Sequence, residues 1–254
     1  MAGRWRLRLL PWAVPTLIVA AWEYTARTGL LPTRILPEPL AVLLAAWHLL
    51  QTGELISNLR VSAGRAFAGL IVGGGLGLVL GLLTGLSVRA QTALDTTLQM
   101  LRNVPPLAMI PLVILWFGID EGAKLFLVAL GVFFPLYLNT FHGIRSVDRG
   151  LIEMARSYGL EGWSLYRDVI LPGALPSILV GLRYSLGLMW VLLIVAETIS
   201  ASSGIGYMTM NAREFLQTDV VLVGILMYAL LGKLADVATR HLERVCLRWH
   251  PSYQ

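Results

Sequence analysis

A few polar and ionisable side chains lie within or near the ends of long apolar runs, where they could meet a charged solute. Glu197 and Arg183 lie toward opposite ends of one run, and Asn139 lies near the end of another. Lys233 and Asp236 are three residues apart, so they can face each other on a helix. Because ionisable groups in such segments are often functional, these five residues are candidates for a translocation pathway. A structural pair explains Lys233 and Asp236 equally well, and Arg183 could instead anchor its helix end or contact a polar loop.

Other kinds of chemistry find no support in the sequence. No Ser/His, Cys/His or HExxH pair lies within the apolar runs, which argues against an intramembrane enzyme with a nucleophile and its base. The lone Cys246 excludes an intrachain disulfide, and no Cys/His cluster indicates a metal site. The chain lacks a GxxxxGK[ST] phosphate loop, so we expect it to bind no nucleotide and no other cofactor by itself.

The composition indicates an all-α integral membrane protein. Of the 254 residues, 56% are hydrophobic and only 14% are charged, and the mean hydropathy is +0.70. A soluble domain has about 25% charged residues, and a helix needs about 20 apolar residues to cross a bilayer. Several runs approach that length, so membrane topology accounts for the net charge of +5 without a nucleic-acid partner.

We expect one domain, residues 1–254, with six membrane spans. The spans cover residues 11–27, 66–86, 105–119, 124–142, 177–199 and 219–239. Residues 40–50 are apolar but too short to span, which predicts a helix at the membrane surface, and residues 87–106 form a polar interval. If the N-terminus is inside, most Lys and Arg residues fall on the inner side, so we expect both termini and residues 146–176 in the cytoplasm.

The second span carries a glycine at every fourth position. These residues, which we call the glycine ladder, are Gly69, Gly73, Gly77, Gly81 and Gly85. Glycines four apart lie on one face of a helix and let another helix backbone approach closely. The ladder therefore predicts tight helix packing, with a neighbour in the same subunit or in another.

A long polar interval from Glu153 to Pro172 predicts a loop of two short helices between the fourth and fifth spans. Asp148 or Ser146 can cap the first helix, and Gly159 can end it in a left-handed conformation. Ser164 can cap the second helix, and Pro172 should prevent its continuation. The expected result is a helix–Gly–helix unit that stands off the membrane.

The spacing in this loop resembles the EAA signature of binding-protein-dependent ABC importer permeases. The motif starts at Glu153, has Gly159 at its fixed distance and ends in Leu171–Pro172, while Met154 and Val169 each replace another apolar residue. The resemblance implies the type I importer fold of six transmembrane helices, whose cytoplasmic loop docks on a separate ATPase. The coupling residues that it implies are Glu153, Met154, Ala155, Arg156, Ser157, Tyr158, Gly159, Leu171 and Pro172.

The resemblance covers nearly the whole chain and also implies partners and a substrate class. The partners are a cytoplasmic ABC ATPase dimer that binds ATP and Mg, a periplasmic or lipid-anchored substrate-binding protein and a second copy of this chain. The bilayer is the bacterial cytoplasmic (inner) membrane. Residues 101–105, 111–120 and 196–201 are similar to those of the subgroup that imports aliphatic sulfonates, taurine or nitrate. Residues 210–219 are most similar to aliphatic sulfonate permeases, so we expect that substrate first and taurine or nitrate next.

An ion-coupled secondary transporter is a more distant alternative. It would show inverted repeats and carboxylates at the membrane midplane. No repeat is evident, and the few acidic residues lie mostly near the ends of the apolar runs.

Overall fold

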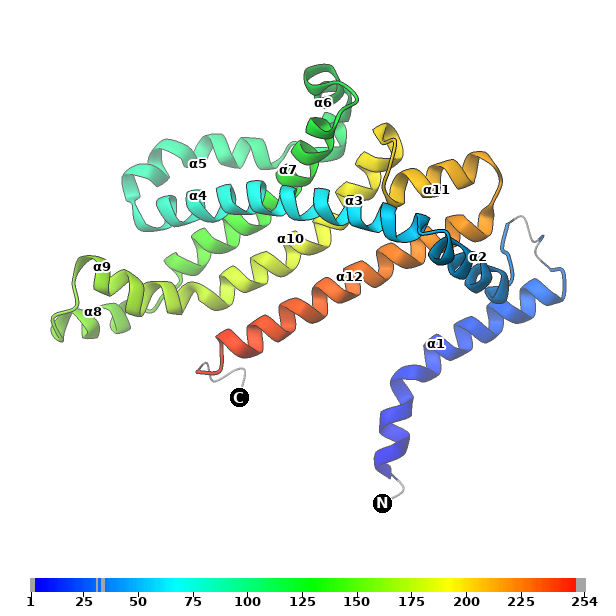
Figure 1. Ribbon diagram of the computed structural model, residues 1–254. Coiled ribbons are helices and arrows are strands. Elements are labelled where there is room, and N and C mark those ends of the chain that lie inside the picture. Colours follow the sequence, from blue (N-terminus) through cyan, green and yellow to red (C-terminus); the bar gives the residue numbers. More distant parts are fainter. Residues whose placement is uncertain (1–2, 31, 33–34, 250–254) are drawn as a thin grey trace.

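The chain folds into an elongated bundle of helices (Figure 1). The computed structural model describes residues 3–30, 32 and 35–249, and every regular element within those ranges is a helix. The predicted all-α class is therefore confirmed. Residues 1–2, 31, 33–34 and 250–254 of the predicted domain lie outside the described residues.

Four long helical runs form the body of the bundle, and each is long and apolar enough to cross a membrane. They contain the predicted spans 66–86, 124–142, 177–199 and 219–239. The runs are α3 (Glu54–Gly69) continued by a π-helical turn (Leu70–Gly74) and α4 (Gly75–Leu86); α7 (Glu121–Arg145); α10 (Leu171–Ser200) with the turns before it; and α12 (Thr218–Cys246).

The predicted third span differs most from the structure. Most of the interval 87–106 forms a helix, α5 (Val88–Arg102), which runs back along α4 (Figure 1). Two successive prolines then interrupt the helix, because proline lacks an N–H and restricts the residue before it. A 3-10 turn (Pro106–Met109) leads into α6 (Ile110–Phe117), and the helix pair is bent by 81° at this break. Residues 105–119 are thus the second arm of a bent helix pair, where a single span was expected.

The predicted number of six spans stays a prediction. Among the described residues, four helical runs meet the length and composition of a span, or five if the bent pair is one span. The predicted first span, 11–27, lies in α1 (Gly3–Arg27), which is helical but is not among those runs. The short helix predicted at residues 40–50 is present as α2 (Pro39–Gln51), which packs against α12.

The glycine ladder faces α7 of the same chain. A Cβ atom on Gly73 would lie only 2.0 Å from the carbonyl oxygen of Ala129, so the two backbones are in direct contact. The tight packing predicted from the spacing is therefore present within one subunit. Cβ atoms on the other ladder residues would each lie 2.8 Å or less from an atom of α7; these residues are Gly69, Gly77, Gly81 and Gly85.

We expect Gly73→Ala to lower the free energy of unfolding by about 1–3 kcal/mol, because the added methyl group forces the helix away from α7. Gly75→Ala is the matched control, since a Cβ at Gly75 meets nothing within 4 Å and alanine favours the helix. Thermal unfolding of both purified variants in detergent measures the difference. Equal melting temperatures would contradict the close contact at Gly73.

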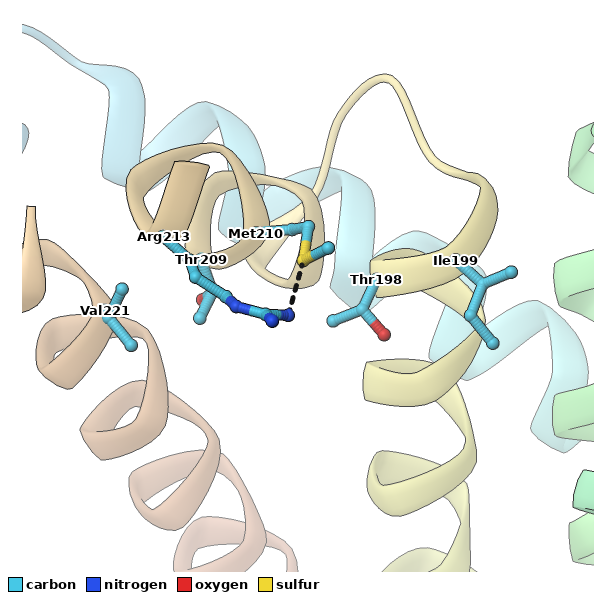
Figure 2. Close-up of a pocket in the computed structure, with 6 residues that line it drawn as sticks. All are labelled: Thr198, Ile199, Thr209, Met210, Arg213 and Val221. Carbon is cyan, nitrogen blue, oxygen red and sulfur yellow. Dashed lines mark hydrogen bonds between the residues drawn. The ribbon is translucent and has the colours of Figure 1, made fainter. Parts of the chain in front are cut away.

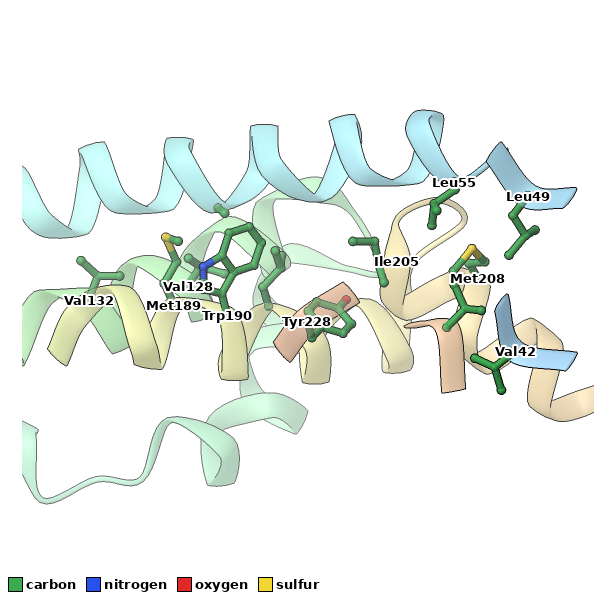
Figure 3. Close-up of a cluster of buried hydrophobic side chains, with 13 residues drawn as sticks. Val42, Leu49, Leu55, Val128, Val132, Met189, Trp190, Ile205, Met208 and Tyr228 are labelled. Carbon is green, nitrogen blue, oxygen red and sulfur yellow. The ribbon is translucent and has the colours of Figure 1, made fainter. Parts of the chain in front are cut away.

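The main apolar core joins the ends of the long helices that lie farthest from the α7–α10 loop. Figure 3 shows Met189 and Trp190 of α10 beside Val128 of α7, with Ile205 of α11 (Ile205–Glu214) farther along. Tyr228 of α12 belongs to the same buried cluster. This core holds α3, α10, α11 and α12 together and positions the polar groups described below.

Candidate coupling loop and charged clusters

The loop between α7 and α10 begins with a well-capped helix, α8 (Arg149–Ser157). The Asp148 side chain accepts a 2.8 Å hydrogen bond from an amide of the first turn. Gly159 has a φ of +82°, which favours glycine, and the Leu160 amide closes the helix end by donating to the Ala155 carbonyl at 3.1 Å. Of the two predicted N-terminal caps, Asp148 is the one present, since Ser146 Oγ donates to the Gly143 carbonyl, and the predicted end at Gly159 is also present.

The second half of the loop corrects two predictions. α9 (Gly162–Leu165) begins after Glu161, and Ser164 donates a 2.7 Å hydrogen bond to the Glu161 carbonyl, so it does not cap the helix. Pro172 does not end a helix either, because a π-helical turn (Tyr166–Ile170) leads directly into α10. Proline is tolerated there because it occupies the first turn after the change in helical pitch.

One face of α8 is held by protein and the other is exposed. Ala155 is buried in a small apolar cluster with Ile144 of α7 and Ile170 at the start of the α10 run, which fixes the loop to both long helices. Tyr158 and Trp163 are 81% and 75% exposed. Large exposed aromatic side chains on a fixed backbone suit a protein docking surface. The other predicted coupling residues that are exposed are Glu153, Met154, Arg156, Ser157, Gly159 and Leu171, and Pro172 is partly buried.

At the opposite end of α10, Glu197 is enclosed by hydrogen-bond donors. Only 1% of the residue is exposed. Ser62 Oγ lies 2.8 Å from both carboxylate oxygens, and Arg65 Nη1 donates at 2.8 Å. The Gly206 amide and the Tyr228 hydroxyl donate at 2.9 and 3.0 Å. These bonds compensate the carboxylate for its lost hydration.

Arg65 extends this network to a second carboxylate. It is 5% exposed, and its Nε and Nη2 atoms each lie 2.6 Å from an oxygen of Glu121. Lys124 is 2% exposed and lies 3.1 Å from Glu121, so two cations balance two carboxylates. We call this group the distal charge cluster; its members are Ser62, Arg65, Glu121, Lys124, Glu197 and Tyr228.

The distal charge cluster fastens the turn between α10 and α11 to α3. Arg65 Nη1 donates to the Ser203 carbonyl at 2.6 Å, and the Gly204 amide donates to the Asn58 side chain at 2.8 Å. Gly204 has a φ of +111°, and a Cβ there would lie 2.4 Å from a Glu197 oxygen, so only glycine fits. These contacts therefore hold α3, the end of α10 and the start of α11 together as one unit.

Sequence reasoning singled out Glu197 but missed its partners. The charge distribution along the chain assigns Arg65 and Lys124 to the outer segments and gives no reason to pair them with a distant carboxylate. One signal was available, because Arg65 lies four positions before Gly69 and so shares the helix face of the glycine ladder, which must pack against protein.

Three of the other candidates form a second cluster between α10 and α12. Arg183 is hydrogen-bonded to Glu243, whose exposed fraction is 4%, and lies 3.9 Å from Asp236. Lys233 faces Asp236 at 3.8 Å, as their spacing predicts, but its side chain is 65% exposed. The structure thus places these three residues far along α10 and α12 from Glu197, and their role in translocation stays a prediction.

Asn139 lies apart from both clusters. Its side chain donates to the Pro135 carbonyl at 2.8 Å within α7, and its own carbonyl accepts a bond from Ser177 Oγ at 2.8 Å. A Cβ on Gly181 would lie 2.6 Å from the Cβ of Asn139. Asn139 therefore helps to join α7 to α10 in this structure.

A pocket of about 380 Å³ lies between the ends of α10, α11 and α12 (Figure 2). Figure 2 shows Arg213 of α11 extended across it toward Thr198, with Nη1 3.6 Å from the Met210 sulfur. The hydroxyls of Thr198 and Thr209 donate to carbonyls of their own helices. Arg213 is the charged residue of this lining, so the pocket offers a cationic surface next to the distal charge cluster.

Sequence comparison relates most of the chain to one family. Residues 73–246 match the family described as binding-protein-dependent transport system inner membrane component. A relative from Escherichia coli (strain K12), named as the permease protein SsuC for aliphatic sulfonates transport, is 64% identical over 250 residues, covering 98% of this chain and 95% of the relative. The taurine transport system permease protein TauC of Escherichia coli (strain K12) is 37% identical over 259 residues, covering 99% and 94%.

Two solved structures share the fold. The crystal structure of an amino acid ABC transporter with histidines matches with a TM-score of 0.58 at 20% identity, covering 77% of this chain and 97% of that one. The MetNI methionine ABC transporter in an inward-facing conformation matches with a TM-score of 0.53 at 18% identity, covering 78% and 97%. At these identities the likeness concerns the fold alone.

Proposed function

This chain belongs to the family of binding-protein-dependent transport system inner membrane components, and we propose that it is the permease subunit of an ATP-driven importer of aliphatic sulfonates. It is a multi-pass, non-catalytic membrane protein, and ATP hydrolysis belongs to a partner ATPase. The observation that carries the substrate is the 64% identity, over nearly the whole chain, to the relative named for aliphatic sulfonates transport.

The proposed assembly contains two copies of this chain, an ATPase dimer that holds ATP and Mg, and a periplasmic or lipid-anchored substrate-binding protein. This chain itself carries no cofactor in the proposal. The α7–α10 loop is the ATPase-docking surface, with Tyr158 and Trp163 as its most exposed aromatic contacts. The loop and both termini then lie in the cytoplasm, and the distal charge cluster lies on the outer side of the inner membrane.

The structure supports a mechanical role for the loop. Ala155 and Ile170 pack in the same apolar cluster as Ile144 of α7, so a displacement of α8 by the ATPase must move the inner ends of α7 and α10 together. At the outer end, the distal charge cluster holds α3, α10 and α11 as one unit. Helices fixed at both ends rock as a rigid body, which is how ATP-driven closure can open and shut a pathway between two copies.

Uptake of labelled substrate into proteoliposomes tests this function. The vesicles contain this chain, its ATPase and its binding protein, with and without internal ATP. We expect ATP-dependent accumulation of butanesulfonate. Uptake that ignores ATP and follows a proton or sodium gradient would overturn the proposal.

Taurine is the second candidate, because the relative named as a taurine permease also aligns over nearly the whole chain, at 37% identity. The same vesicles, offered taurine and nitrate in parallel, decide between the substrates. ATP-dependent uptake of taurine or nitrate without butanesulfonate would keep the importer mechanism and replace the substrate.

A further inference from the structure

The bend between α5 and α6 lies deep within the membrane-spanning part of the bundle. A pocket of about 460 Å³ at this bend is lined by Phe134, Pro135 and Leu138, near the centre of α7, and by Leu188 and Val191, well inside α10. Both helices are long enough to cross a membrane, so the pocket lies within the apolar layer and away from either surface.

Arg102 gives this apolar pocket a positive charge. It shares the lining with one other polar residue, Asn103, whose side chain donates to the Gln99 carbonyl at 3.0 Å. The lining contains no acidic residue. Arg102 is exposed, and no Asp or Glu in the described part of the chain forms an ion pair with it.

Two physical constraints place this bend next to water. An exposed, unpaired guanidinium is strongly disfavoured against lipid at this depth, so such residues face a bundle interior or a water-filled cavity. Irregular backbone at membrane depth is tolerated only inside protein or along such a cavity. The segment from Asn103 to Pro105, directly after Arg102, is both irregular and exposed in the isolated chain, so it fits the wall of an aqueous pathway.

An alkanesulfonate matches the chemistry of the pocket. A guanidinium presents a planar fork of N–H donors that can pair with two oxygens of one anionic group. The apolar side chains around it suit a short alkyl chain, and a volume of about 460 Å³ is typical of small-molecule sites.

We propose that Arg102 binds the sulfonate group of the substrate as it crosses the membrane, with the alkyl chain against α7 and α10. The identity of the anion rests on the function proposed above. The alternative is a purely structural role, in which Arg102 stabilises the C-terminal end of α5 as a cation in its last turn. The tests below distinguish this role from anion binding.

The first test asks whether position 102 faces water and does not depend on transport. Arg102→Cys is made in a Cys246→Ala background, because Cys246 is the one native cysteine. The probe is a methanethiosulfonate that carries an ethylsulfonate group: the thiolate attacks its sulfenyl sulfur, a mixed disulfide forms and methanesulfinate leaves. Leu230→Cys on α12, which is 50% exposed at a mid-helix position, is the control for a lipid-facing site.

We expect the cysteine at position 102 to react at least about tenfold faster than the one at position 230, since the thiolate forms only where water reaches it. Equal, slow labelling at both positions would overturn the inference, even if wild-type vesicles transport none of the offered anions.

The second test asks whether the charge binds the anion. Arg102→Gln should lower butanesulfonate uptake about tenfold or more, because a charged hydrogen-bonding partner is lost, while Arg102→Lys retains an intermediate rate. Binding-protein-stimulated ATP hydrolysis should stay within about twofold of wild type, since ATPase docking is untouched. Arg89→Gln, at the other end of α5, is the matched control and should transport normally.

Two outcomes would overturn the charge assignment. Wild-type uptake by the Arg102→Gln variant would show that the charge is dispensable. An equal loss of uptake and ATP hydrolysis would indicate a structural role. Failure of wild-type uptake itself would count against the proposed function, which keeps the two conclusions separate.

Discussion

Gly159→Glu should abolish transport by this protein and prevent its ATPase from assembling with it. Gly159 is exposed at the end of α8, and a Cβ there meets nothing within 4 Å, so the chain itself has room for a side chain. The glutamate would instead enter the proposed docking surface, where a buried, unpaired charge costs several kcal/mol. Because about 1.4 kcal/mol corresponds to a tenfold change, we expect a loss of about a hundredfold or more.

Two further variants separate docking from backbone strain. Gly159→Asn tests the φ of +82°, which asparagine tolerates better than most residues, and should keep much of the activity. Gly29→Glu places the same side chain on another exposed glycine of positive φ (+68°), between α1 and α2 and outside the α7–α10 loop, and should do less harm. Co-purification of the ATPase and ATP-dependent uptake are the measurements. Normal assembly and uptake by Gly159→Glu would contradict docking at this loop.

The first half of the coupling loop was predictable because its determinants are local. A cap at Asp148 and a left-handed Gly159 depend on residues within one or two helical turns, and both are present. Pro172 was misjudged because the rule for proline assumes uniform helical pitch, whereas a π-helical turn precedes it here. Local rules therefore succeed where local geometry is regular.

The bent pair α5 and α6 was missed for a related reason. Charged residues in the interval 87–106 suggested a loop. One face of α5 nevertheless packs on α4, and this tertiary packing stabilises a helix whose own sequence is only weakly apolar. The glycine ladder could be predicted as a packing face, but its partner could not, because spacing on one helix does not identify the helix opposite. The same limit applies to Glu197, whose donors come from α3, α11 and α12.

Glu197→Gln should be among the most destabilising single changes in the chain, although it keeps the size of the side chain. One carboxylate oxygen faces Arg65 Nη1, and the other faces the Gly206 amide. Whichever oxygen becomes the NH₂ group, a donor then meets a donor, and Arg65 loses half of its counter-charge. Breaking a buried ion pair on one side costs about 3–5 kcal/mol, and we expect a loss of that order.

A matched set of variants tests whether the paired charge is the cause. Glu214→Gln on α11 removes an exposed carboxylate and should change stability by less than about 0.5 kcal/mol. Combining Arg65→Met with Glu197→Met should cost less than Glu197→Met alone, because it leaves no unpaired buried charge at Arg65, while Glu121 keeps Lys124 at 3.1 Å. Thermal unfolding in detergent, with the ATPase absent, measures these four variants and Arg65→Met alone. If the double variant is less stable by the sum of its single changes, the two residues act independently, and the distal charge cluster is no electrostatic tie between α3 and α10.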